Sequence, residues 1–170
     1  MPNDTLIPAK AITEADQSDS IVVSFGAEWQ QLLLSKAFSV VIRKRIPKNI
    51  AFKWLYFHIN SPVGAICGRA EITKIFTATE TEAIGLAREI NLSPAEISSY
   101  INGDRAIGCY MLGKIQLTDS PVPASTLATR LTYHAPQSFF ILSKKAKEVV
   151  DHFTGFNYSN TFKSPKRGKS

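Results

Sequence analysis

The sequence IVVSF at Ile21–Phe25, followed by a helical segment and then by FSVVIRKR at Phe38–Arg45, gives the clearest indication of architecture. Ile21–Phe25 is short and apolar, which predicts a buried strand ending at Gly26. Ala27–Lys36 carries apolar side chains at helical spacing, whereas Phe38–Arg45 alternates and is rich in β-branched residues. The chain is therefore predicted to open with a strand, a helix and a second strand.

The rest of the chain continues with strands and adds a central helical part. Predicted strands are Ala51–Asn60, Val63–Phe76, Ala106–Leu117 and Phe139–Leu142. Predicted helices are Thr79–Ile90, Pro94–Ile101 with Ser93 as N-cap, and Lys144–Phe153, with a loop at Ser120–Pro123 and a helical turn at Thr126–Leu131. No βαβ alternation occurs, which disfavours a doubly wound sheet. We expect an α+β pseudo-barrel of five to six strands with a central helical insertion.

Composition and charge predict one folded domain with charged ends. The chain has 170 residues, a net charge of +6 and 44% hydrophobic residues, enough for a substantial core. We expect a flexible acidic arm at 1–18, the domain at 19–154 and a basic, flexible tail at 155–170. The N-terminus lacks the features of a secretory signal, and no apolar run reaches the ~20 residues that cross a bilayer. These features predict a cytoplasmic protein with no membrane partner.

The cysteines and histidines do not predict a metal centre. Cys67 and Cys109 each lie among apolar residues, which favours two buried thiols. The three histidines, His58, His134 and His152, are far apart and have no metal-ligand spacing. We therefore expect no metal and no cofactor, and the sequence leaves the oligomeric state open.

The positive charge of the domain is concentrated in one segment. Its members are Arg43, Lys44, Arg45, Lys48 and Lys53, with no acid between them. Alternation places Arg43 and Arg45 on one face of their strand, where guanidinium groups could bind phosphate or a guanine edge. Such a segment suits a polyanion partner. The alternative is an exposed edge strand whose lysines prevent sheet-to-sheet aggregation.

Two strands have a structural and a functional interpretation. The aromatic residues of Ala51–Asn60 could stack on nucleobases, but a strand apolar on both faces is more often a central core strand. Glu71 is an isolated acid in a strand and could act as a general base. By alternation it shares a face with Arg69 and Thr73, so the simpler prediction is a row facing solvent.

Several sequence blocks together resemble the ASCH domain family of the PUA-like superfamily, in particular the subgroup described as predicted transcriptional regulators. The order and spacing of the blocks are similar over about residues 21–142. The blocks are Val22-Val23-Ser24-Phe25 with Trp29, Leu34-Ser35-Lys36, Ile42-Arg43-Lys44-Arg45-Ile46-Pro47, Asn60-Ser61-Pro62-Val63-Gly64-Ala65-Ile66-Cys67-Gly68, Ile107-Gly108-Cys109-Tyr110 and Ala135-Pro136-Gln137-Ser138-Phe139.

The resemblance implies a small PUA-like β-barrel of mixed strands with a cleft toward which the arginine-bearing strand points. It also implies RNA or modified-nucleotide binding, with a regulatory role. The nucleic-acid-binding candidates are Arg43, Lys44, Arg45, Lys48, Lys53, Ser24, Gln137 and Ser138. The alternative interpretation for Gln137 and Ser138 is turn chemistry.

The family is also associated with a ribonuclease activity and with an amidohydrolase that acts on acetylated cytidine. The amidohydrolase pattern has a Lys, then a Thr three residues later, then an Arg two further on. When that Arg is aligned with Arg43, Phe38 and Val41 stand at the Lys and Thr positions. Neither side chain can move a proton or attack a substrate. We therefore expect a binding module rather than an enzyme and assign no catalytic residue, with a hydrolase of RNA or of an acylated nucleoside as the alternative.

Overall fold

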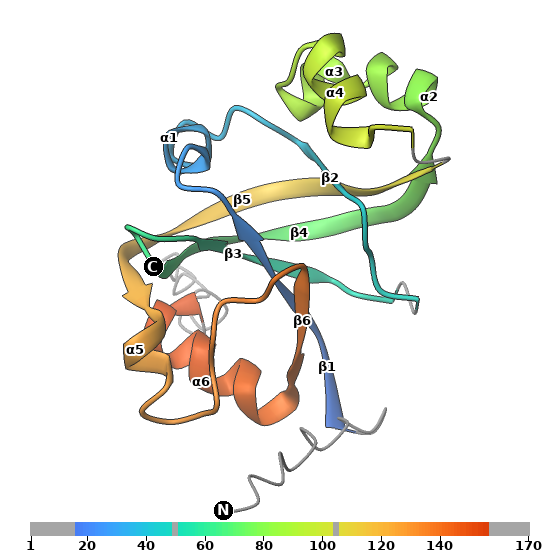
Figure 1. Ribbon diagram of the computed structural model, residues 1–170. Helices are drawn as coiled ribbons and strands as arrows, with labels where there is room; N and C mark the ends of the chain where they lie inside the picture. The colour runs from blue at the N-terminus through green and yellow to red at the C-terminus, as the bar shows by residue number, and fades with distance from the viewer. Residues whose placement is uncertain (1–15, 49–50, 104–105, 157–170) are drawn as a thin grey trace, which may run out of the picture.

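A six-stranded mixed sheet with helices at both ends forms the protein (Figure 1). The computed structural model describes residues 16–48, 51–103 and 106–156. The strands lie in the order β2-β5-β4-β3-β1-β6, with β1 and β3 parallel and the other neighbours antiparallel. The strands are β1 (Gln17–Phe25), β2 (Val40–Arg43), β3 (Trp54–Ile59), β4 (Ala65–Ala78), β5 (Ile107–Pro123) and β6 (Phe139–Ser143).

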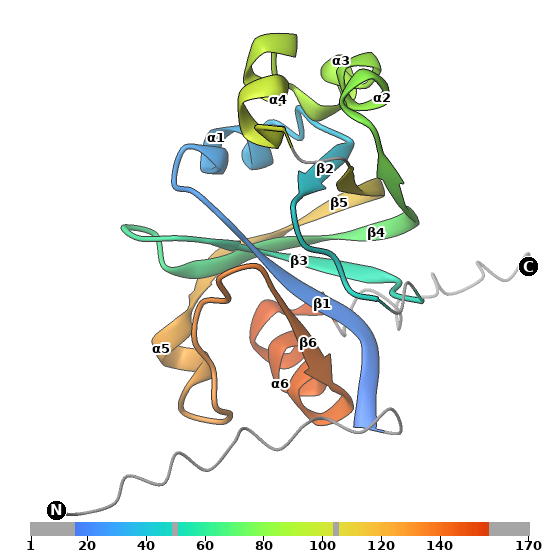
Figure 2. The same ribbon diagram turned by 45° about the vertical axis from the view of Figure 1, so that its right-hand side comes forward.

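The helices form two groups on opposite sides of the sheet (Figure 2). The helices are α1 (Trp29–Leu34), α2 (Glu80–Gly85), α3 (Ala87–Ile90), α4 (Pro94–Ile101), α5 (Ala124–Leu127) and α6 (Lys144–Thr154). Helices α2, α3 and α4 form the predicted insertion and pack on the outer face of β2. Helices α5 and α6 cover the opposite side, under β1, β3 and β6. None of the helices among the described residues is long and apolar enough to span a membrane.

The α+β class, the mixed sheet and the helix after the first strand are confirmed, but the sheet does not close into a barrel. Strands β2 and β6 are its two edges, and no pairing joins them in the described parts of the chain. Strand β2 is short, because its ladder with β5 covers only Val40–Arg43. The long strands β4 and β5 pair with register shifts, which bend a sheet. The sheet therefore curves around the core but stays open beside β2.

Each face of the sheet carries its own hydrophobic cluster. Strand β3 is central and buried on both sides, since Leu55 and Phe57 face one cluster and Tyr56 faces the other. The prediction of a core strand is thus confirmed, since the rings of Tyr56 and Phe57 are buried and that of Trp54 is half-buried. On β2, Val41 faces the first cluster while Val40 packs under the helical insertion. This alternation directs the side chain of Arg43 toward the interior of the curved sheet.

Several element boundaries differ from the predictions, three of them with a clear structural consequence. The expected helix Thr79–Ile90 is broken after Gly85, where α2 ends and α3 begins. The predicted loop Ser120–Pro123 belongs to β5, which pairs with β4 as far as Pro123. Prolines are tolerated there because β2 has already ended, which leaves one side of β5 without a ladder. Strand β1 begins at Gln17, within the predicted arm at 1–18, and most of that arm and of the tail at 155–170 lies outside the described residues.

Candidate nucleic-acid interface

Arg43 ends β2 and is fixed by backbone carbonyl groups from two strands. Its Nη1 donates to the carbonyl of Ile42 at 2.7 Å, and its Nη2 donates to the carbonyl of Ser24 in β1 at 2.8 Å. The guanidinium carbon lies 4.3 Å from the centre of the Phe25 ring. Because β1 and β2 share no ladder in the described structure, the Arg43 side chain is a direct link between them.

The side chain of Arg43 is largely buried, and two tyrosines lie close to it. Burial lowers the pKa of Arg43, and a hydrogen bond with Tyr100 opposes that shift. An arginine keeps its charge despite such a shift. Burial also raises the pKa of Tyr110, an effect that the nearby Arg43 charge partly offsets. The hydroxyl of Tyr110 is buried and has no hydrogen-bond partner among the described residues. Arg43 is therefore a charged group whose immediate side-chain neighbours include the hydroxyl groups of Tyr100 and Tyr110.

A pocket of about 350 Å³ opens beside Arg43, between β1, α1, β2 and the helical insertion. Its charged side chains are Glu28, Arg43 and Glu96, and Trp29 and Tyr100 supply aromatic surface. The other lining residues are Ser24, Phe25, Gly26, Ile42 and Leu92. The sequence did not predict a binding role for the two acids or Tyr100, because they lie on helical segments where solvent-exposed polar faces are common.

The two acids of the pocket are placed by local structure. The Glu28 carboxylate folds back over Gly26, in the space that a Cβ would occupy at that position. The Glu96 carboxylate accepts a hydrogen bond from the Ser93 backbone N–H at 2.7 Å, as part of the capping box of α4. Hydrogen bonds with Ser93 lower the pKa of Glu96, so this group is ionised at neutral pH. One edge of the pocket is thus acidic, while Arg43 is basic.

The other predicted binding residues occupy different places around the pocket. The Ser24 hydroxyl donates to the Pro136 carbonyl at 2.6 Å, which brings the turn before β6 against β1. Gln137 is exposed and Ser138 half-buried in that turn, but neither lines the pocket. Arg45 lies beyond the end of β2, so the alternation that would put Arg43 and Arg45 on one face does not reach it.

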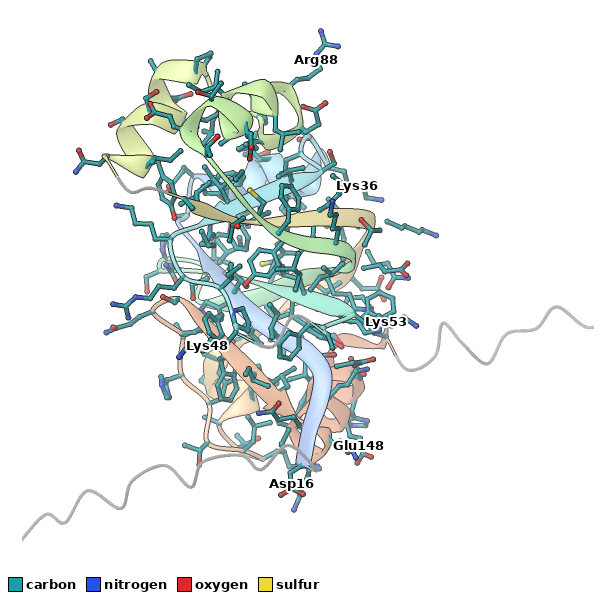
Figure 3. The ribbon with its side chains drawn as sticks, turned by 90° about the vertical axis from the view of Figure 1, so that its right-hand side faces the viewer. Asp16, Lys36, Lys48, Lys53, Arg88 and Glu148 are labelled. Carbon is teal, nitrogen blue, oxygen red and sulfur yellow. The ribbon has the colours of Figure 1, made fainter. Side chains whose placement is uncertain are left out.

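The exposed cations do not form one patch. Lys44, Arg45, Lys48 and Lys53 are all exposed. The Nζ atom of Lys44 lies 5.7 Å from the Tyr100 ring centre, next to the pocket, whereas that of Lys53 lies 5.7 Å from the Trp54 ring centre. Lys48 and Lys53 project well apart from one another in Figure 3. The predicted basic segment is therefore divided. The contact of Lys44 with Tyr100 places this cation next to the pocket.

Arg69 forms a second polar centre, on the opposite face of the sheet. Only 4% of Arg69 is exposed, so its predicted place in a solvent-facing row is wrong, although Glu71 and Thr73 are exposed as expected. The guanidinium carbon lies 3.9 Å from the Trp54 ring centre and 4.5 Å from that of Phe156. Arg69 is buried because Trp54, Phe156 and Asp151 surround it, and alternation within one strand could not predict these contacts.

The partners of Arg69 connect the sheet to α6. Its Nε donates to Gln116 at 2.8 Å, and its Nη1 lies 3.8 Å from the carboxylate of Asp151. Tyr56 donates its hydroxyl to the same carboxylate, and Lys147 donates to it at 3.1 Å. Burial and the Asp151 charge raise the pKa of Tyr56, which keeps its hydroxyl protonated. Because its polar groups pair with one another, this cluster is a structural connection rather than a vacant site.

The thiols and histidines lack the properties of catalytic or metal-binding groups. Burial raises the pKa of Cys109 to about 11 and also raises that of Cys67, so both are thiols at neutral pH. His58 Nδ1 lies 2.8 Å from the Tyr133 hydroxyl, and burial lowers the pKa of His58. Across residues 16–48, 51–103 and 106–156, no three His, Cys, Asp or Glu side chains gather as a metal site would require.

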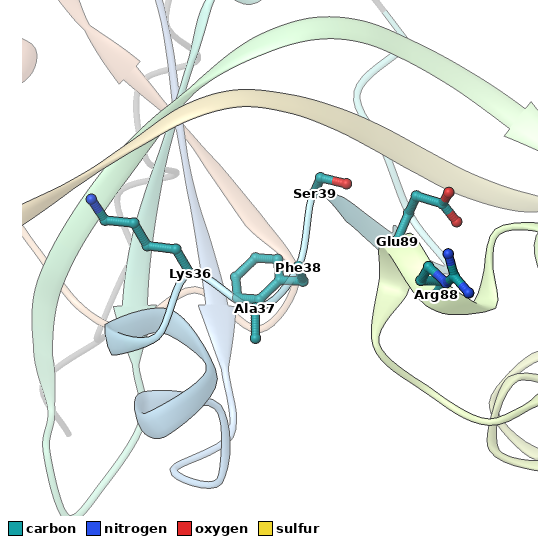
Figure 4. Close-up of a pocket in the computed structure, with 6 residues that line it drawn as sticks. All are labelled: Lys36, Ala37, Phe38, Ser39, Arg88 and Glu89. Carbon is teal, nitrogen blue, oxygen red and sulfur yellow. The ribbon is translucent and has the colours of Figure 1, made fainter.

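A second pocket, of about 290 Å³, lies where the segment before β2 meets α3 (Figure 4). The Lys36 side chain extends away from Arg88 in that view, so the two cations do not converge on one point. Phe38 also lines this pocket but is only 4% exposed, and Val41 is fully buried. Both positions of the amidohydrolase pattern thus hold core side chains, which does not favour the hydrolase alternative.

The fold defines a class of protein: an α+β domain with an open, curved, six-stranded sheet and a pocket between its edge strand and a helical insertion. The ASCH protein of Zymomonas mobilis has this fold, with a TM-score of 0.72, 22% identity and coverage of 80% of this chain and 96% of that one. A single-residue variant of the same protein matches equally well, with 81% and 99% covered. At this identity the likeness establishes a shared ASCH, PUA-like fold.

More distant structures and sequence comparisons add little to that result. The N-terminal domain of McrB from Staphylothermus marinus matches with a TM-score of 0.54 and 8% identity, over 80% of this chain and 94% of that domain. No protein-family model matches the sequence, and no curated protein matches it either. The comparisons therefore establish the fold through its likeness to ASCH proteins.

Proposed function

We propose that the protein is a nucleic-acid-binding module of the ASCH type, with single-stranded RNA as its ligand. One observation carries this proposal: Arg43 is fixed beside a pocket of about 350 Å³ and is followed at once by the exposed cations Lys44 and Arg45. Exposed cations supply affinity for phosphates, and a pocket supplies a place for an unstacked base. Duplex RNA does not present bases in this way, so single strands are the better ligand.

The arrangement supports binding more than catalysis. Arg43 donates to two carbonyl groups, and burial raises the pKa of the nearby Tyr110, so that hydroxyl is not a base at neutral pH. General-base catalysis needs a group whose pKa lies near the working pH. A regulatory role, as implied by the subgroup that the sequence resembles, would then follow from occupancy of the RNA.

The test is the salt dependence of RNA binding, measured by fluorescence anisotropy with a labelled single-stranded RNA of mixed sequence. If three to five phosphates are neutralised, log K should fall with log salt with a slope of about −2 to −3.5. The double variant Lys44→Ala/Arg45→Ala should bind more weakly and reduce the magnitude of the slope by about 1. DNA of the same sequence, measured alongside, shows whether the 2′-hydroxyl contributes.

The matched control is Lys144→Ala/Lys145→Ala, which removes the same charge from exposed positions at the start of α6. This control should leave binding close to that of the unaltered protein, because α6 lies on the opposite side of the sheet from the pocket (Figure 2). Failure to bind RNA or DNA at low salt would refute the proposal. Equal losses in both double variants would refute the assigned position of the interface.

A further inference from the structure

The charges of the Arg43 pocket have the wrong balance for a phosphate. Two carboxylates, from Glu28 and Glu96, line the pocket against the single guanidinium of Arg43. A phosphate placed among them would meet two like charges, which disfavour its binding. Phosphates therefore belong outside the pocket, near Lys44 and Arg45, and the pocket itself requires a ligand without negative charge.

The hydrogen-bonding groups of the pocket require a ligand with two different edges. Arg43 has five N–H donors and uses two of them on the carbonyls of Ile42 and Ser24 and one on Tyr100, so two donors remain for an acceptor edge. Glu28 presents a carboxylate, which only accepts hydrogen bonds. A ligand that satisfies both must carry adjacent acceptors on one edge and adjacent donors on another.

We propose that this pocket recognises a guanine base, an inference that rests on the proposed function. Guanine has the acceptors O6 and N7 on one edge, which suit the fork of Arg43, and the donors N1–H and N2–H₂ on another, which suit the carboxylate of Glu28. Adenine, cytosine and uracil cannot offer a paired acceptor edge and a paired donor edge together. Guanine is thus the common base that can bond with both the Arg43 guanidinium and the Glu28 carboxylate.

The pocket is held ready for a planar ligand. The Glu96 carboxylate is held in the capping box of α4, the Glu28 carboxylate lies over Gly26, and Arg43 is fixed by two carbonyls. Trp29 and Tyr100 give the pocket aromatic surface on which a base can stack. The volume of about 350 Å³ is near the lower end of the range for small-molecule sites, about 300–1,000 Å³, which suits a single nucleotide.

The experiment compares mononucleotides that share one phosphate and differ only in the base. Binding of GMP, AMP, CMP, UMP and IMP is measured by isothermal titration calorimetry. GMP should bind at least about tenfold more tightly than AMP, CMP or UMP, because a bidentate pair discriminates by about that factor or more. IMP lacks the N2 amino group and 7-deaza-GMP lacks N7, and each should bind about fivefold more weakly than GMP.

The variant Glu28→Gln separates base recognition from phosphate binding. It keeps the size of the side chain but replaces the carboxylate, so the preference for GMP over IMP should disappear. Affinity for guanine-containing RNA should fall, because the base contact is lost, whereas the salt slope of RNA binding, set by the phosphate contacts, should stay unchanged. Glu148→Gln, at an exposed position of α6, removes the same charge elsewhere and should keep the GMP preference.

The possible results distinguish this inference from the proposed function. Binding of RNA together with equal affinity for all five mononucleotides, or a preference for a base other than guanine, would overturn the guanine assignment alone. Retention of the full GMP preference in Glu28→Gln would overturn the role of that carboxylate. Absence of RNA binding combined with absence of GMP binding would overturn both proposals.

Discussion

Arg43 and Arg69 are both withdrawn from solvent, but they have different kinds of partner. Arg69 lies beside Asp151 and donates to Gln116, and it is stacked between Trp54 and Phe156. Arg43 donates to the backbone carbonyls of Ile42 and Ser24 and bonds with Tyr100, and its guanidinium lies over the ring of Phe25. Arg69 is therefore compensated within the fold, while Arg43 keeps donors for a ligand.

Removal of the acid from the Arg69 cluster should destabilise the protein strongly. In Asp151→Asn the buried guanidinium loses its anionic partner, and a buried charge without compensation costs about 3–5 kcal/mol. Urea unfolding followed by circular dichroism measures the change. Glu148→Gln on the same helix is exposed and should change the unfolding free energy by less than about 0.5 kcal/mol. A loss below about 1 kcal/mol in Asp151→Asn would contradict the structural role of the cluster.

His58 should make stability depend on pH on the acidic side of neutrality. Burial lowers the pKa of His58 in the folded state, so the unfolded chain takes up the proton first as the pH falls. The unfolding free energy should therefore decrease as the pH falls below about 6.5, the ordinary pKa of histidine.

The variant His58→Gln isolates this contribution. It should have a shallower fall of the unfolding free energy between pH 7 and pH 5 than the unaltered protein, in urea titrations at each pH. His134→Gln is the control, because His134 is exposed and its replacement should leave the slope unchanged. Parallel pH profiles for His58→Gln and the unaltered protein would show that His58 titrates normally.

Among the elements, the helix caps follow most directly from sequence. The Ser93–Glu96 pair predicted the start of α4, and both hydrogen bonds of the capping box are present. The end of α4 at Asn102 also agrees, because this residue adopts the left-handed conformation that ends helices. A helix cap depends only on residues that are close together in the sequence, so it can be predicted without knowledge of the tertiary structure.

Loss of the Ser93 cap should weaken α4 and the acidic edge of the pocket together. Ser93→Ala removes the hydroxyl that accepts from the Glu96 N–H at 3.1 Å and should cost about 1 kcal/mol of unfolding free energy. Ser99→Ala, at an exposed position within the same helix, should be neutral or slightly stabilising because alanine is the better helix former. Equal unfolding midpoints for the two variants in urea would contradict the importance of the cap.

Non-local structure explains what could not be predicted. The extent of β5 depends on β2 ending early, which frees one side of the strand at its prolines. The burial of Arg69 depends on Asp151 and Phe156, which are more than 80 residues away in sequence. In the pocket, Arg43 could be named from its segment, but Glu28 and Tyr100 join it only through the packing of helices.

At the scale of the whole molecule, the sheet separates the Arg43 pocket from the Arg69 cluster. The helical insertion and α1 border the Arg43 pocket at one end, and α6 with the Arg69 cluster covers the other face (Figure 1). The exposed cations of the segment after β2 are also divided, so the net charge of +6 does not correspond to one continuous binding face. Position, rather than total charge, therefore determines where a polyanion would bind.

Arg43 joins two strands that are not neighbours in the sheet. Strands β3 and β4 are joined by a ladder, whereas β1 and β2 share no ladder in the described structure and are linked by the hydrogen bond from Arg43 to Ser24. Loss of that bond would break no backbone hydrogen bond of the sheet. A ligand that draws Arg43 away from Ser24 would loosen this link between β1 and β2, so the width of the pocket and its occupancy are coupled through one side chain.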